Sequence, residues 1–180
     1  MAYRLDFEKE LHYEGVRMRA YRKGPVGALM DEYERASADL KLLLSSISEP
    51  DFTAVIDAQT QDENCRSVRT IVTHVVQSGY SYANYIREQL STPRSSPVVG
   101  PVPHQKAEAE INAMLDYTAN TLDGRWEMRD DEITRTFIHS RWRVRYYLEQ
   151  LPEHGIVHIL RHRRQIEPLR RQASAQKEPA

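Results

Sequence analysis

Three of the seven histidines stand four residues apart near the end of the chain, in the segment EHGIVHILRHRRQI. If this segment is helical, steps of four place His154, His158 and His162 in a single row along one face. The row continues through Gln165 and is flanked by isoleucines, while the arginines of the segment fall outside it. We therefore expect the three imidazoles to face the interior of the protein rather than water.

Stacked interior histidines point to metal chemistry. They cannot all be protonated, because like charges repel in a poorly solvated site, and a neutral imidazole is a common metal ligand. Two histidines at positions i and i+4 can bind one ion, and a third ligand must then come from another helix. An isolated buried histidine is more commonly a hydrogen-bonded core residue, but three in register favour a metal site. The candidate third ligand by position is His74, in SVRTIVTHVV.

The position of His74 on its own helix is ambiguous. It lies roughly 140° from the centre of the apolar stripe of that helix, on a wheel of about 100° per residue. It could therefore face solvent, or its face could border a polar cavity, and periodicity leaves both interpretations open. The neighbours of His74 on this face are Ser67, Ser78, Ser81 and Tyr85.

The sequence lacks the other common catalytic patterns. A di-iron bundle needs paired Glu-x-x-His motifs, and neither these nor HExxH or CxxC occur. Cys65 is the single cysteine, which excludes an intrachain disulfide and a thiolate zinc cluster. Its place at an expected helix start would favour the thiolate, but we expect a structural role.

For the arginines of 161–171 we expect a solvated helix face, with contact to an anion or nucleic acid as the alternative.

Composition and charge describe one globular domain over residues 1–180. The formal net charge is -1, whereas a dedicated nucleic-acid binder normally carries a basic excess. No apolar run approaches the roughly 20 residues of a membrane-spanning helix. The N-terminal segment MAYRLDFEKELHYEG is too charged for a signal peptide, so we expect a cytoplasmic location.

Four amphipathic helices are expected to position these residues. Apolar side chains recur with a period of about 3.6, and the predicted helices span residues 24–47, 65–90, 104–122 and 146–171. Ser48-Glu49-Pro50 is expected to end the first helix, and Pro152 to bend or restart the last one.

The segments between the helices complete the predicted fold. Residues 91–103, STPRSSPVVGPVP, contain four prolines, so we expect an extended crossover. We expect residues 125–145 to form a structured loop with a short helix or hairpin, residues 1–24 a packed arm, and residues 172–180 a flexible tail. The prediction is an all-α, four-helix bundle with one long crossover loop and a core over about 25–171.

Two segments resemble the DinB/YfiT-like superfamily of bacterial metal-dependent proteins. Residues 67–90 resemble the second helix of that family with its single histidine, and residues 153–169 resemble the H-x-x-x-H-R-x-Q element of its last helix. The resemblance implies a four-helix bundle with up-down-down-up connectivity. It also implies a divalent ion held by His74, His158 and His162, with His154 as a pocket residue beside the ligands.

Three neutral imidazoles leave at least one coordination position open, as in catalytic metal sites. Imidazole favours zinc or nickel, with iron, copper and manganese as alternatives. Two activities suit such a site: hydrolysis by an activated water, or attack by a low-molecular-weight thiol, the second suggested by related bundles. His154 is the candidate general base, and Tyr85 and Gln165 are candidates to orient a bound ligand or cofactor.

Other functions stay open at this point. The ion could instead stabilise the bundle or serve sensing in a non-enzymatic protein, or the protein could be stress-associated and contact nucleic acid through the arginines of the last helix. We expect a small-molecule substrate as the partner, together with possible homodimer formation, and neither a membrane nor nucleic acid as a main partner.

Overall fold

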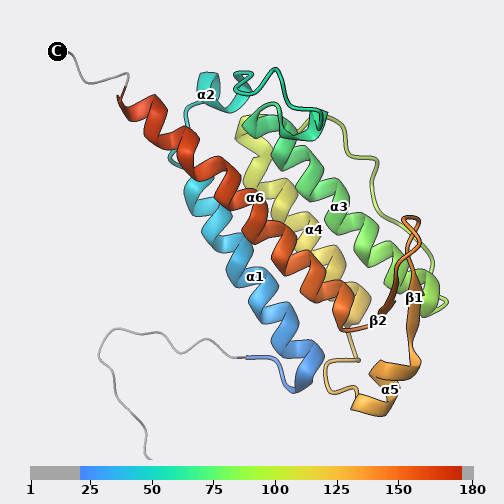
Figure 1. Cartoon of the computed structure of the whole chain (residues 1–180). Coiled ribbons are helices and arrows are strands. Elements are labelled where there is room, and N and C mark those ends of the chain that lie inside the picture. The colour runs from blue at the N-terminus through green and yellow to red at the C-terminus, as the bar shows by residue number, and fades with distance from the viewer. Residues whose placement is uncertain (1–20, 176–180) are drawn as a thin grey trace, which may run out of the picture.

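Four long helices packed side by side dominate the computed structural model, which describes residues 21–175 (Figure 1). The long helices are α1 (Gly24–Leu44), α3 (Val68–Gln89), α4 (Ala107–Leu122) and α6 (Gln150–Ala175). The shorter elements are α2 (Glu49–Thr53), α5 (Asp130–Arg135), the strands β1 (Phe137–His139) and β2 (Arg145–Tyr147), and 3₁₀ turns at Glu63–Cys65 and His104–Lys106. The protein is therefore mostly helical, as predicted, with a small hairpin added.

Apolar stripes of the long helices meet in one shared core. Met30 and Leu40 of α1, Val72 of α3 and Ile159 and Ile166 of α6 are all fully buried in it. Burial of such side chains contributes roughly 1.5–3 kcal/mol each relative to exposure. No helix in the described part of the chain is both long and apolar enough to cross a membrane.

Close helix packing depends on two glycines. A Cβ at Gly79 would lie 2.3 Å from Met114 Sδ of α4, and one at Gly155 would lie 3.0 Å from the ring of Tyr33 of α1. Gly155 falls between His154 and His158, so the absence of its side chain lets α6 approach α1 directly beside the histidine row.

Two polar side chains fix the start of α3. Ser67 and Thr70 form a reciprocal capping box, in which the Thr70 N–H donates to Ser67 Oγ over 3.1 Å and the Ser67 N–H donates to Thr70 Oγ1 over 3.0 Å. The box satisfies two backbone donors that a helix start leaves free. It sets the helical phase about two turns before His74.

The proline-rich segment 91–103 contains no helix, as predicted, and runs back along α3. Asn84 donates to Ser96 Oγ, and the Val102 N–H donates to Thr73 Oγ1. Later positions of the segment thus contact earlier positions of α3, so the chain returns to the end of the molecule where α3 began. As a result α3 and α4 start at the same end.

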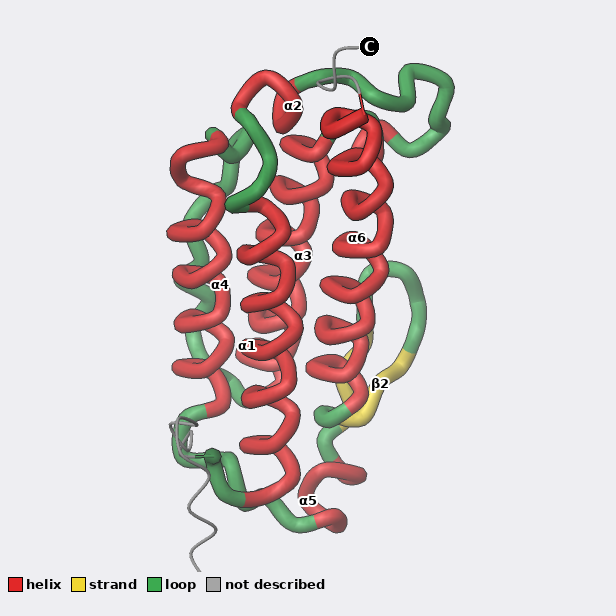
Figure 2. The backbone as a smooth tube through the Cα atoms, turned by 90° about the vertical axis from the view of Figure 1, so that its left-hand side faces the viewer, coloured by secondary structure: helices red, strands yellow, loops and turns green. Residues whose placement is uncertain are grey.

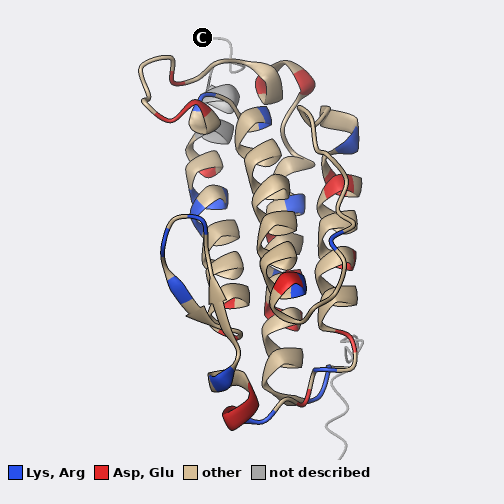
Figure 3. Ribbon diagram, turned by 90° about the vertical axis from the view of Figure 1, so that its right-hand side faces the viewer, with Lys and Arg blue, Asp and Glu red and all other residues tan. Residues whose placement is uncertain are grey.

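Residues 125–145, predicted as a loop with a short helix or hairpin, contain both kinds of element. Helix α5 lies at the opposite end of the four helices from α2 (Figure 2). Strands β1 and β2 pair antiparallel, with Phe137 opposite Tyr147. The hairpin stands beside the helices and carries basic residues (Figure 3).

The last helix differs from its predicted boundaries. Tyr146 belongs to β2, and the helix begins at Gln150, so the predicted start was wrong. Pro152 falls in the first turn, where a missing N–H breaks no intrahelical bond, and the expected bend or restart there is not needed. Pro168 is the proline inside the helix. The backbone stays helical to Ala175, so the helix extends beyond the predicted end at residue 171, while 176–180 lie outside the described residues.

The end of the first helix and the segment that follows it also differ in detail from the prediction. Helix α1 ends at Leu44, and Ser48 caps α2 through its Oγ, which accepts the Asp51 N–H. The Ser-Glu-Pro segment therefore starts a helix rather than only ending one, since proline suits a first helical turn. Most of the predicted N-terminal arm, residues 1–20, lies outside the described residues.

Candidate metal centre

Three histidines from two helices converge on one point. The ring of His74 on α3 lies 4.9 Å from that of His158 and 5.2 Å from that of His162, and the two α6 rings are 4.4 Å apart, centroid to centroid. Each residue offers one ring nitrogen, and these three nitrogens lie within 4.8 Å of one another. The three residues proposed as a ligand set are thus brought together, and they could hold a metal ion.

The polar face of α3 is explained by this arrangement. His74 is half-buried against α6 rather than exposed. Of the two interpretations that periodicity left open, solvent or a polar site, the structure therefore favours the polar site.

Two of the three histidines present ring nitrogens that no other side chain or backbone group of the described structure contacts by a hydrogen bond. His162 is 2 % exposed, and the Nε2 atoms of His158 and His162 are buried without a hydrogen-bond partner among the described residues. Leaving a buried polar atom unsatisfied costs about 1–3 kcal/mol. A cation coordinated by both lone pairs would remove that cost, so the residues present fit a metal ion.

Gln165 determines which nitrogen of His162 is available. Its Oε1 lies 2.6 Å from His162 Nδ1, and a carbonyl oxygen can only accept a hydrogen bond. Nδ1 therefore carries the proton, and Nε2 keeps its lone pair. Metal-binding histidines commonly donate their second ring nitrogen in this way. Gln165 thus orients a histidine directly, whereas its predicted contact with a bound ligand stays a prediction.

Burial keeps the three imidazoles neutral. It lowers the pKa of His158 to about 3, with a further contribution from the charges that His162 and His74 would carry. Burial is also the largest cause that lowers the pKa of His74 and of His162. At neutral pH all three side chains are therefore in the form that binds metals.

An acidic residue that the sequence analysis missed stands near the group. Asp62, just before the 3₁₀ turn, is close enough for its charge to raise the pKa of His74 against the effect of burial. Its Oδ2 lies 3.5 Å from the Cys65 thiol, which lies 3.9 Å from Gln165 Oε1. Asp62 lies in a loop without periodicity, so no pattern in the sequence pointed to it.

Cys65 does not have the thiolate character that a helix start would favour. It ends the 3₁₀ turn, before α3 begins at Val68. Burial and the neighbouring charge of Asp62 raise the pKa of its thiol. The expectation of a structural role fits this setting better than that of a nucleophile.

His154 lies beside the three-histidine group, whereas Tyr85 contacts the hairpin. The His154 ring stacks on His158, with centroids 6.3 Å apart and planes 20° apart. The Tyr85 hydroxyl accepts the Arg141 N–H over 3.1 Å and so holds the hairpin against α3. The tyrosine nearest the group is Tyr82, 5.8 Å from the His158 ring. Its spacing from His74, twice four residues, is the signal that could have identified it.

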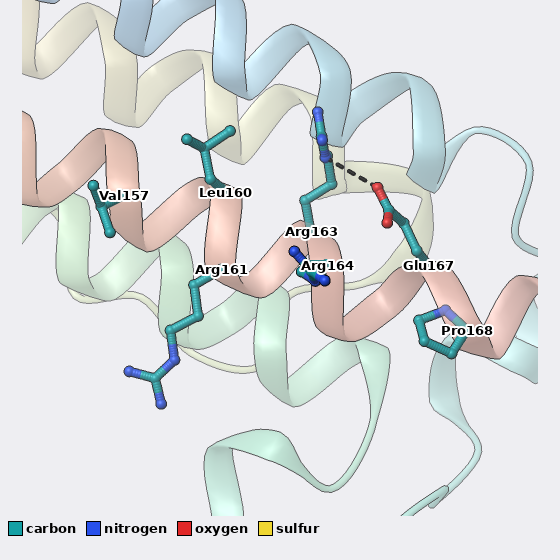
Figure 4. Close-up of a pocket in the computed structure, with 7 residues that line it drawn as sticks. All are labelled: Val157, Leu160, Arg161, Arg163, Arg164, Glu167 and Pro168. Carbon is teal, nitrogen blue, oxygen red and sulfur yellow. Dashed lines mark ion pairs between the residues drawn. The ribbon is translucent and has the colours of Figure 1, made fainter.

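The arginines of α6 occupy the outer side of the helix. A surface hollow there is lined by Val157, Leu160, Arg161, Arg163, Arg164, Glu167 and Pro168 (Figure 4). Arg163 pairs with Asp39 of α1 at 2.8 Å and with Glu167 at 3.2 Å. Arg161 and Arg164 are exposed, so this side matches the expected solvated face.

No protein-family model, curated protein or solved structure matches this chain in the comparisons with known proteins.

Proposed function

We propose that this protein is a divalent-metal-dependent enzyme, a hydrolase or a transferase that uses a low-molecular-weight thiol. The observation that carries the proposal is the pair of buried Nε2 atoms of His158 and His162 that have no hydrogen-bond partner within residues 21–175, with His74 completing a set of three ligand atoms. A purely structural histidine cluster would gain from hydrogen bonds to these atoms.

The donor set supports a transition metal. Three neutral nitrogens favour zinc or nickel, with iron, copper and manganese as alternatives, over hard ions that prefer oxygen. Three protein ligands also leave at least one position for a substrate atom, as in catalytic sites.

Residues of the chain have separate roles around the bound ion. A bound divalent ion supplies acidity to a coordinated water or thiol and polarises a carbonyl. Gln165 holds the His162 ring in position from outside. Burial lowers the pKa of His154, so this side chain is a neutral imidazole one turn from the site and can accept a proton. Because hydrolysis and thiol transfer both start with loss of a proton from the nucleophile, one site serves either reaction.

The DinB/YfiT-like superfamily is the family we propose. The two resembling segments contain the three converging histidines. The crossover that runs back along α3, and the common starting end of α3 and α4, support the up-down-down-up connectivity of that family.

The test combines metal analysis with turnover. Purified protein should contain close to one transition-metal ion per chain, and it should turn over members of an ester and thiol-acceptor panel. His158→Ala and His162→Ala should lose both metal and turnover. Metal binding with no turnover across the panel would contradict the enzymatic proposal.

A non-enzymatic role is the second candidate, and one observation favours it. The ligands come from two helices, α3 and α6, so an ion would cross-link them and stabilise the fold. A large loss of thermal stability on chelation, without any turnover, is the outcome expected for this alternative.

A further inference from the structure

Four ring-bearing side chains from separate elements gather directly beside the three-histidine group. Tyr82 of α3 lies 5.3 Å from His154 of α6, edge to face. Trp142 of the hairpin turn stacks on His154 at 6.2 Å, with planes 27° apart. Tyr146 of β2 lies 5.8 Å from the same imidazole. We call these four residues the aromatic cluster.

The aromatic cluster is continuous with the candidate metal centre. His154 stacks on His158, and Tyr82 stands edge-on to His158 at 5.8 Å. A molecule that placed its reacting atom at the three histidines would therefore extend over these rings within about one helical turn, roughly 5.4 Å.

The hairpin tip leaves aromatic surface open to solvent. Trp142 is 40 % exposed, although its indole N–H donates to the Tyr146 hydroxyl over 3.2 Å. The turn is held by two backbone donors, since the Arg141 N–H donates to the Tyr85 hydroxyl and the Arg143 N–H donates to the Ser140 carbonyl over 3.0 Å. The exposed indole therefore offers a flat apolar surface in a fixed orientation, and this surface is not used in packing the core.

The charge next to these rings is positive. Arg141 and Arg143 are exposed on either side of Trp142. A group of aromatic rings on its own attracts cations. The two neighbouring arginines instead favour an anionic ligand at this cluster.

We propose that the aromatic cluster and Arg141 form a binding site for a small aromatic carboxylate. The flat ring of the ligand packs on the solvent-exposed part of Trp142, and its carboxylate pairs with Arg141. This proposal depends on the proposed function in one respect, because it identifies the ligand as the non-reacting part of the substrate. Binding itself requires no metal.

Fluorescence quenching tests the site without any turnover. The chain has two tryptophans, so Trp126→Phe leaves Trp142 as the sole indole emitter. The probes are 4-nitrobenzoate, its neutral analogue 4-nitrobenzamide, and the cation (4-nitrobenzyl)trimethylammonium. Each is titrated into the chelator-treated protein and again after zinc loading.

We expect saturable quenching by the carboxylate in both preparations, with affinity about fivefold above that of the amide, the size of one exposed charge pair. Arg141→Gln should remove this preference, and the matched control Arg69→Gln, on an exposed residue of α3, should retain it. Equal binding of acid and amide, tighter binding of the cation, or no saturation with any probe would each overturn the proposal. If the protein binds no metal but the carboxylate still quenches its fluorescence, the proposed metal chemistry fails and the aromatic binding site is still supported.

Discussion

Gln165 Oε1 lies 2.6 Å from Nδ1 of His162, and this contact places the ring proton on the nitrogen that faces away from the three-histidine group. The side chain of Gln165 is itself on the exposed side of α6. A surface residue thus determines the orientation of a buried candidate ligand atom.

Gln165→Ala should therefore weaken metal binding without unfolding the protein. Loss of such an outer partner typically reduces metal affinity by about 10–100-fold. Competition titration against a chromophoric chelator measures the change, with Arg164→Ala as the neighbouring exposed control. Equal affinity in the two variants would show that the hydrogen bond does not position His162.

The two α6 histidines should contribute far more than the histidine one turn before them. His158→Ala and His162→Ala should each abolish binding of one ion per chain, and circular dichroism should show that most helix remains. His154→Ala should reduce affinity less, because its ring lies outside the group of three. The same loss in all three variants would mean that the ligand pair on α6 is wrongly assigned.

Acid should destabilise the metal-free protein through His158. Its pKa is about 3 in the folded state, against an ordinary value of 6.5. Between these two pH values the side chain is protonated in the unfolded chain and neutral in the folded one. The stabilising contribution is complete above pH 6.5 and is lost as the pH falls toward 3. Because the ring is only half-buried, we expect a loss of about 1–2 kcal/mol between pH 7 and 5. Denaturant titrations at several pH values should show this slope in the wild type and a smaller one in His158→Gln.

A side chain at Gly79 should loosen the contact between α3 and α4. Its Cβ would meet Met114 Sδ at 2.3 Å, and overpacking of this kind costs about 1–3 kcal/mol. Gly79→Val should lower the midpoint of thermal unfolding by several degrees. Gly100→Val is the control, because a Cβ there meets nothing within 4 Å. A similar effect of both substitutions would argue against the close helix contact.

The sequence predicted the features that depend on local periodicity. The four long helices follow from apolar stripes, and the row of His154, His158 and His162 follows from their four-residue spacing. The direction in which His74 points depends on which helix packs against its polar face. That is a tertiary relationship, so the helix wheel alone left it open.

Features built by loops were harder to predict. The apolar pattern predicted Tyr146 as part of a helix, but it pairs with Ile138 in the hairpin, which places its ring against His154. Asp62 and Trp142 belong to segments without a regular period, which precede the helices that carry His74 and His154. Only the folded chain brings these residues to the site.

Titration of chelator-stripped protein with zinc, in wild type and in His74→Ala, tests the convergence of α3 and α6 on one ion most directly. We predict one zinc per chain in the wild type and loss of that binding in the variant, with both proteins folded by circular dichroism. Unchanged stoichiometry and affinity in His74→Ala would contradict this prediction.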